Sequence, residues 1–161
     1  DNMILTSTHI GHNCVIGNNI TMANVVHISG HVSVGDYTTI GGMTGIHQFV
    51  RIGKGCMIGG YSRLPQDIPP FMLCEGNPAY VRNLNLIGCK RRGMSKETIA
   101  DLRQLFKLLY RSNLNTSQAL AEFSPEGTSD EVQHLLDFIK ADSSRGIAKK
   151  TDNNATTAVS E

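Results

Sequence analysis

Aliphatic residues recur at every sixth position through the first 64 residues of the chain. The series consists of Ile4, Ile10, Ile16, Met22, Ile28, Val34, Ile40, Ile46, Ile52, Ile58 and Leu64. An amphipathic helix requires apolar spacings of three and four, and a half-buried strand requires strict alternation. A sustained period of six, with a small residue often following the aliphatic one, is typical of the hexapeptide repeats of a parallel β-helix.

Each six-residue unit is expected to form one side of a triangular coil, so that 18 residues complete a turn. The aliphatic residue fills the axis of the prism. The Gly that follows in units such as Gly41 and Gly53 is expected to allow the tight corner without a Cβ clash. The first and fifth positions of each unit face inward, and the other positions face outward.

Five of the six histidines fall on outward positions of this repeat, namely His9, His12, His27, His31 and His47. His9 and His27 are one full coil apart, so they should stack at about the 4.8 Å spacing of neighbouring strands. His12 and His31 should lie on adjacent coils. Cys14 occupies an inward position, which places its thiol in the core.

The repeat defines a first domain over residues 1–70, expected to continue a longer β-helix because the pattern is already present at the first residue, which is not Met. Pro65, Pro69 and Pro70 are expected to end it, since Pro cannot donate to a strand ladder. Residues 71–94 are predicted to be an ordered connector with a basic cluster at 90–92. Residues 148–161 are polar and aperiodic, which predicts a disordered tail.

Residues 95–147 are predicted to form a small α-helical C-terminal domain. Ser95 is expected to cap a helix with an apolar face that includes Leu102 and Phe106. A shorter helix is expected around 119–123, and Ser129 should open another.

Composition narrows the classes of function. The formal net charge of +1 argues against a nucleic-acid or membrane-surface partner. The four cysteines show no zinc-ribbon or paired spacing, and neither a leader nor an apolar run of about 18 residues is visible. A soluble, reduced, cytoplasmic protein without stable membrane insertion is therefore expected.

The stretch "THIGHNC", residues 8–14, allows three interpretations: a metal site, a general base, or ordinary surface histidines. A metal site needs at least three ligands, and within the histidine-bearing coils the only carboxylate is Asp36. We therefore expect no metal and no cofactor. Several outward histidines clustered on a rigid prism favour a base that works near neutral pH.

The segments "HIGHNCVIG", "GHVSVGDYTTIGGMTGIHQF", "QDIPPF" and "NLNLIGCKRRG" resemble the UDP-N-acetylglucosamine O-acyltransferases that use acyl carrier protein, from about residue 3 to residue 147. The resemblance implies a left-handed β-helix and a homotrimer with clefts between subunits. It implies transfer of an (R)-3-hydroxyacyl group from acyl carrier protein to the 3-hydroxyl of UDP-N-acetylglucosamine, the first step of lipid A (lipopolysaccharide) synthesis.

The resemblance also implies roles for individual residues. His12 matches the general base and Gly30 the backbone oxyanion donor. The remaining matches are His9, His31, His47 and Gln48 lining the substrate cleft, Asn85 and Arg91 contacting the nucleotide, and Gly60 at the end of the acyl pocket. Gly60 would leave room for a longer acyl chain. Asn13 stands where the family usually has Asp, and Ile87 where it often has Glu.

Two other functions are compatible with the sequence. A different hexapeptide-repeat enzyme could transfer an acetyl group from coenzyme A, although the "HQF" and "KRRG" segments argue against it. An inactive β-helix scaffold would account for Asn13. Gly60 is equally compatible with a structural glycine, and the basic cluster with a solvated patch or a docking site for the acidic carrier protein.

Overall fold

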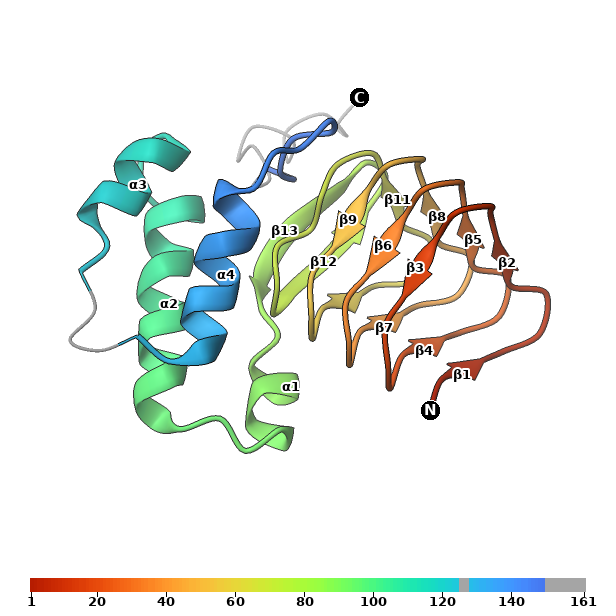
Figure 1. Cartoon of the computed structure of the whole chain (residues 1–161), viewed down its shortest axis with the longest axis horizontal. Coiled ribbons are helices and arrows are strands. Elements are labelled where there is room, and N and C mark those ends of the chain that lie inside the picture. The colour runs from red at the N-terminus through yellow and green to blue at the C-terminus, as the bar shows by residue number, and fades with distance from the viewer. Residues whose placement is uncertain (125–127, 150–161) are drawn as a thin grey trace, which may run out of the picture.

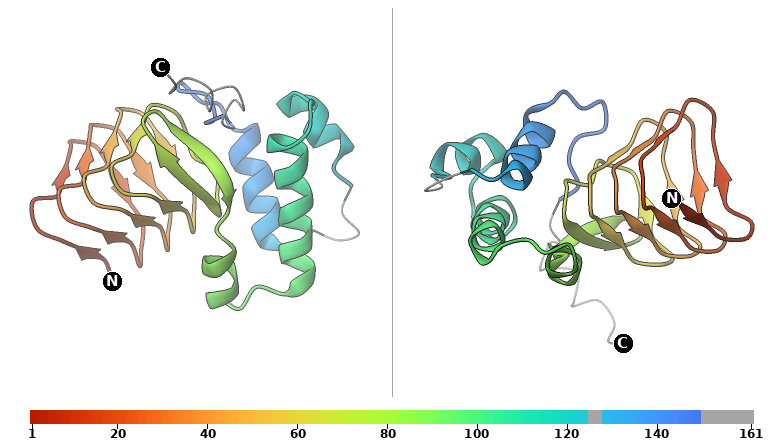
Figure 2. Two further views of the ribbon diagram at one scale, coloured as in Figure 1. Left: turned by 180° about the vertical axis from the view of Figure 1, so that it is seen from behind. Right: turned by 60° about the horizontal axis from the view of Figure 1, so that its bottom comes forward.

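The computed structural model describes residues 1–124 and 128–149 and confirms the predicted fold class. A left-handed parallel β-helix at the N-terminal end is followed by a group of helices stacked beyond its last coil (Figure 1). Figure 2 shows from two further sides that the helices lie at one end of the prism, with the N-terminus at the other. None of the described helices is long and apolar enough to cross a membrane.

The coils are built from two-residue strands. These are β1 Met3–Ile4, β2 His9–Ile10, β3 Val15–Ile16, β4 Thr21–Met22, β5 His27–Ile28, β6 Ser33–Val34, β7 Thr39–Ile40, β8 Gly45–Ile46, β9 Arg51–Ile52, β10 Met57–Ile58 and β11 Arg63–Leu64. The three faces of the prism contain the sheets β1-β4-β7-β10-β12-β13, β2-β5-β8-β11 and β3-β6-β9. Partners within each face, such as His9 and His27, are 18 residues apart.

From Ile20 onward the core follows the repeat as predicted, whereas Ile4 in the first coil is 46% exposed. Aliphatic first positions such as Ile28 and Ile40 are fully buried, and so is the fifth-position residue Val26. The polar fifth-position residue Thr38 is buried as well, and its hydroxyl donates to the Gly53 carbonyl at 2.9 Å. This bond satisfies a buried hydroxyl that would otherwise destabilise the core.

The glycines at the corners avoid a Cβ clash, as predicted. The glycines after the aliphatic residue do not adopt the left-handed backbone conformation; they are needed because the next coil passes close by. A Cβ on Gly41 would lie 2.4 Å from the Gly60 nitrogen. The left-handed conformation instead occurs at the fourth position of each unit, with φ between 56° and 65° at Ser7, Asn13, Asn19, Val25, His31, Tyr37, Met43, Phe49 and Tyr61.

The prolines do not end the sheet. Strand β12 (Met72–Gly76) continues the parallel pairing, with Met57 opposite Leu73, and β13 (Ala79–Leu84) adds an antiparallel partner. Pro65, Pro69 and Pro70 lie between β11 and β12, where they remove no hydrogen bond from either strand. The predicted connector therefore contains two strands and a short helix, α1 (Leu86–Arg91).

The helical region contains α2 (Lys96–Tyr110), α3 (Thr116–Glu122) and α4 (Asp130–Lys140). The predicted caps Ser95 and Ser129 each accept a hydrogen bond from the third residue of their helix. Helix α3 begins before the predicted Ala119 because Asn115 and Gln118 form a capping box.

The predicted tail begins with ordered residues. After α4 the chain returns to the β-helix, where Ala148 is buried and its N–H donates to the Asp67 carbonyl. Residues 150–161 lie outside the described residues.

Candidate active site

One edge of the prism collects most of the predicted site residues. The corners that follow β2, β5 and β8 lie above one another and contain His12, Gly30, His31, His47, Gln48 and Phe49, a group that we call the histidine edge. This edge is at the upper right of Figure 1. The side chains of His12, His31 and His47 are exposed, as their outward repeat positions predict.

The His12 ring is oriented by its neighbour. His12 Nδ1 lies 2.9 Å from the side-chain oxygen of Asn13. Since an amide oxygen can only accept, Nδ1 carries the proton and Nε2 keeps its lone pair. Asn13 occupies a left-handed corner, with φ of 58°, a conformation that Asn tolerates better than most residues. The arrangement leaves Nε2 free to accept a proton.

Gly30 lies directly against that nitrogen. A Cβ on Gly30 would be 2.7 Å from His12 Nε2 and 2.8 Å from Cε1, so a larger residue would displace the ring. The Gly30 carbonyl accepts a hydrogen bond from Phe49 at 3.2 Å. Within residues 1–124 and 128–149, the Gly30 N–H has no acceptor. A base and an unpaired backbone donor thus lie side by side.

Two series of aromatic rings run from coil to coil: His9 with His27, and His12 with His31 and Phe49. The rings of His9 and His27 stack at 4.6 Å, which confirms the stacking predicted from their spacing. The His31 ring meets that of His12 edge to face at 4.9 Å and stacks on Phe49 at 4.9 Å. Phe49 follows His31 by one coil of 18 residues, so the period could have identified it.

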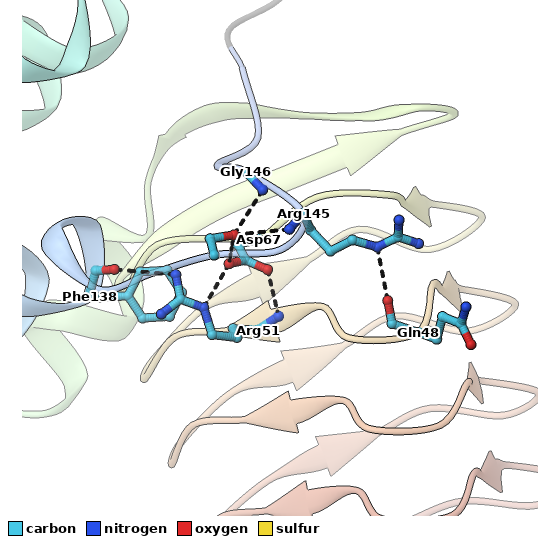
Figure 3. Close-up of polar contacts among 7 residues, drawn as sticks. Gln48, Arg51, Asp67, Phe138, Arg145 and Gly146 are labelled. Carbon is cyan, nitrogen blue, oxygen red and sulfur yellow. Dashed lines mark hydrogen bonds and ion pairs between the residues drawn. The ribbon is translucent and has the colours of Figure 1, made fainter.

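His47 and Gln48 are contacted by a residue that the sequence did not suggest. Arg145 Nη2 lies 2.9 Å from His47 Nε2, and Arg145 Nε donates to the Gln48 carbonyl at 2.9 Å. His47 Nδ1 lies 3.3 Å from the same carbonyl. Figure 3 shows Arg145 extending from the C-terminal segment toward Gln48.

The predicted nucleotide contacts lie elsewhere, at a cleft of about 460 Å³ between α1 and the face that contains β7 and β10. Asn85 and Arg91 both line this α1 cleft. Asn85 also has a structural role, because its oxygen caps α1 at Gly88 and its amide donates to the Gly55 carbonyl. Arg91 is exposed at the end of α1.

Gly60 occupies a different corner from the histidine edge. It is exposed and lies beside Gly42 of the coil below, whose carbonyl oxygen would be 3.1 Å from a Cβ on Gly60. A single copy of the chain therefore distributes the predicted site residues over separate corners of the prism.

The cysteines are poor candidates for a nucleophile. Burial raises the pKa of the Cys56 and Cys74 thiols to about 12, and it also raises the pKa of Cys89. The Cys14 thiol points inward and donates to the Ser29 carbonyl at 3.1 Å. The described residues contain no group of three or more His, Cys, Asp or Glu side chains that could hold a metal ion.

The comparisons with known proteins agree on one family. A family model described as UDP N-acetylglucosamine O-acyltransferase, domain 2, matches residues 67–148. The acyl-(acyl-carrier-protein)–UDP-N-acetylglucosamine O-acyltransferase of Paracidovorax citrulli is 52% identical over 155 residues, which cover 92% of this chain and 58% of that protein. The protein of the same name from Gloeothece citriformis is 43% identical over 139 residues, covering 86% and 50%.

Solved structures give the same result. LpxA from Acinetobacter baumannii superposes with a TM-score of 0.85 at 39% identity, covering 92% of this chain and 58% of that one. A UDP-N-acetylglucosamine acyltransferase from Campylobacter jejuni gives a TM-score of 0.85 at 42% identity, covering 93% and 58%. The chain spans about half the length of the curated relatives it matches.

Proposed function

The chain belongs to the UDP-N-acetylglucosamine O-acyltransferase family, and we propose that it contributes the catalytic base to an acyl transfer. In this reaction an (R)-3-hydroxyacyl group passes from acyl carrier protein to the 3-hydroxyl of UDP-N-acetylglucosamine. In this proposal the reaction is the first step of lipid A synthesis and takes place in the cytoplasm. The observation that supports it best is the free His12 Nε2 beside the unpaired Gly30 N–H.

His12 would act as the general base. Its Nε2 accepts the proton of the sugar hydroxyl while that oxygen attacks the thioester carbonyl of the acyl carrier protein. Negative charge then develops on the carbonyl oxygen, and the Gly30 N–H stabilises it as a preorganised donor. The step forms an ester and releases the carrier thiol, so it requires no covalent enzyme intermediate and no cofactor.

Asn13 affects the strength of this base. Its oxygen holds the ring in the required tautomer at 2.9 Å, as a carboxylate would. An amide has no net charge, however, so it stabilises the protonated ring less than Asp does. The proposed enzyme keeps the orientation of the base and gives up part of the electrostatic assistance.

The separation of the site residues supports a homotrimer. The histidine edge and the α1 cleft lie at different corners of one copy. In the proposed assembly, the α1 cleft of one copy faces the histidine edge of the next, so that Asn85 and Arg91 contact the nucleotide bound near His12. The planar guanidinium of Arg91 suits a phosphate group. Gly60 then borders the acyl pocket and leaves room for a longer chain.

The decisive experiment is an acyl-transfer assay on the purified protein with UDP-N-acetylglucosamine and 3-hydroxyacyl carrier proteins of several chain lengths. We expect ester formation, and a loss of at least about 100-fold in kcat for His12→Ala, as is usual for removal of a general base. His134→Ala is the matched control, because His134 is an exposed histidine on α4.

The same assay separates the other two functions. Product from acetyl-coenzyme A but not from the carrier protein would indicate the acetyltransferase. Absence of product with every donor, or equal rates for the wild type and His12→Ala, would contradict the proposal and favour a scaffold.

A further inference from the structure

The segment after α4 is fastened to the β-helix by one buried carboxylate. Asp67 has no exposed surface and accepts hydrogen bonds from the Arg51 Nε at 2.7 Å, the Arg51 N–H at 2.8 Å and the Ser143 hydroxyl at 2.7 Å. The Arg51 guanidinium in turn lies over the Phe138 ring at 4.4 Å (Figure 3). These contacts join the β-helix, α4 and the C-terminal segment at one point.

Backbone bonds complete the attachment. The Asp67 N–H donates to the Gly146 carbonyl at 2.9 Å, and the Asp67 carbonyl accepts from the Ala148 N–H at 2.8 Å. The Ser143 hydroxyl oxygen accepts from the Arg145 N–H at 3.2 Å and from the Gly146 N–H at 2.8 Å. Residues 143–148, which we call the strap, are therefore held on both sides of Arg145.

The strap places the Arg145 guanidinium between two residues of the histidine edge. One nitrogen donates to the Gln48 carbonyl and another contacts His47 Nε2, both at 2.9 Å. A guanidinium can only donate, so His47 Nε2 must be the acceptor and Nδ1 must carry the ring proton. That proton points toward the Gln48 carbonyl at 3.3 Å. Both ring nitrogens of His47 are thus engaged by the protein.

We propose that Arg145 is a positioning residue for the acyl transfer: it fixes the orientation and tautomer of His47 and the backbone of Gln48 at the histidine edge. This inference rests on the proposed function, because the two residues that it positions are the ones expected to line the substrate cleft. The planar guanidinium suits this task, since its donors have a fixed relative geometry that a Lys ammonium lacks.

The first test needs no activity. Side-chain ¹⁵N spectra of the histidine-labelled protein should show the His47 Nδ1 as protonated and Nε2 as an acceptor. In Arg145→Ala and Arg145→Lys, the Nε2 signal should move toward the protonated type, because its fixed donor is lost or displaced. Unchanged His47 signals in Arg145→Ala would overturn the inference, even if the protein transferred no acyl group.

The second test uses the acyl-transfer assay. Arg145→Ala should raise the KM for UDP-N-acetylglucosamine about tenfold and change kcat less than about twofold, because it displaces groups that bind substrate and leaves His12 intact. Ser143→Ala should shift the same His47 signals by loosening the strap while keeping the guanidinium. Arg103→Ala, an exposed arginine on α2, is the control for loss of a positive charge.

An Arg145→Ala protein with altered His47 signals but wild-type KM and kcat would show that the contact is structural and would also overturn the proposal. Thermal melts of each variant separate a local effect from unfolding. If the wild-type protein forms no ester in the assay, the result counts against the proposed function. The His47 spectra of Arg145→Ala then still test whether Arg145 fixes the His47 ring.

Discussion

Gly30→Ala is the sharpest test of the proposed chemistry, because the three atoms nearest the added methyl group all belong to the His12 side chain. The new Cβ would lie 2.7 Å from His12 Nε2, 2.8 Å from Cε1 and 3.1 Å from Cδ2. Carbon and nitrogen atoms normally approach no closer than about 3.5 Å. The exposed ring must therefore move by nearly 1 Å, which it can do by turning toward solvent.

The expected loss of kcat/KM follows from the displacement of the His12 ring. A catalytic group misplaced by about 1 Å can cost about 100-fold in rate. We expect kcat/KM to fall by about 10-fold to 100-fold, which corresponds to about 1.4–2.7 kcal/mol of transition-state stabilisation. Stability should change little, by less than about 0.5 kcal/mol, because the clash is relieved at the surface.

Two other glycines provide matched controls. In Gly11→Ala the Cβ would lie 2.7 Å from the Gly30 nitrogen, a backbone atom that cannot turn away, so we expect a loss of about 1–3 kcal/mol in stability. In Gly45→Ala the Cβ meets nothing within 4 Å, and the melting temperature should stay constant or rise.

Initial-rate assays and thermal melts of the three variants together test the reasoning. A Gly30→Ala protein that melts normally and keeps full kcat/KM would refute the placement of the base beside Gly30. A Gly30→Ala protein that unfolds like Gly11→Ala would show that the ring cannot move, and the activity loss would then say nothing about the chemistry.

Two further predictions concern the framework of the site. Asp67→Ala should lower the free energy of unfolding by about 3 kcal/mol in urea titrations, since it removes a buried partner of Arg51. The control Asp137→Ala, at an exposed position on α4, should change the free energy of unfolding by less than about 0.5 kcal/mol. Equal losses in the two variants would contradict the role of Asp67 in attaching the strap. Because the pKa of the Cys56 and Cys74 thiols is raised to about 12, the folded protein retains protons that the unfolded chain releases near pH 9; stability should therefore fall as the pH rises from about 9 toward 12. Both thiols should resist iodoacetamide in the folded state at pH 9, and rapid alkylation would contradict their burial.

Much of the histidine edge could be predicted from the period alone. A six-residue repeat determines which side chains face outward, so it predicts the stacking of His9 on His27 and the proximity of His12 and His31. The same reasoning could have included Phe49. It could not identify the left-handed corners, because Asn13, Tyr37 and Phe49 share no chemical property that would indicate a positive φ.

The six-residue period does not predict the parts of the site that lie outside the repeat. Strands β12 and β13 lack the six-residue period, so they appeared as a connector. Arg145 lies 98 residues from His47, and nothing in the local sequence links them. In the proposed trimer, the relation between the α1 cleft and the histidine edge is set by contacts between copies, which no pattern along one chain records.

The strap joins parts of the β-helix to residues that are synthesised much later. Each coil pairs with residues 18 positions away, so the β-helix can grow one rung at a time as the chain leaves the ribosome. The Ser143–Asp67 contact spans 76 residues and the Arg145–His47 contact spans 98, so both form late. A nascent chain therefore displays its stacked histidines well before His47 is held in place. In the proposed role of Arg145, the orientation of His47 is thereby coupled to the completion of the helical region.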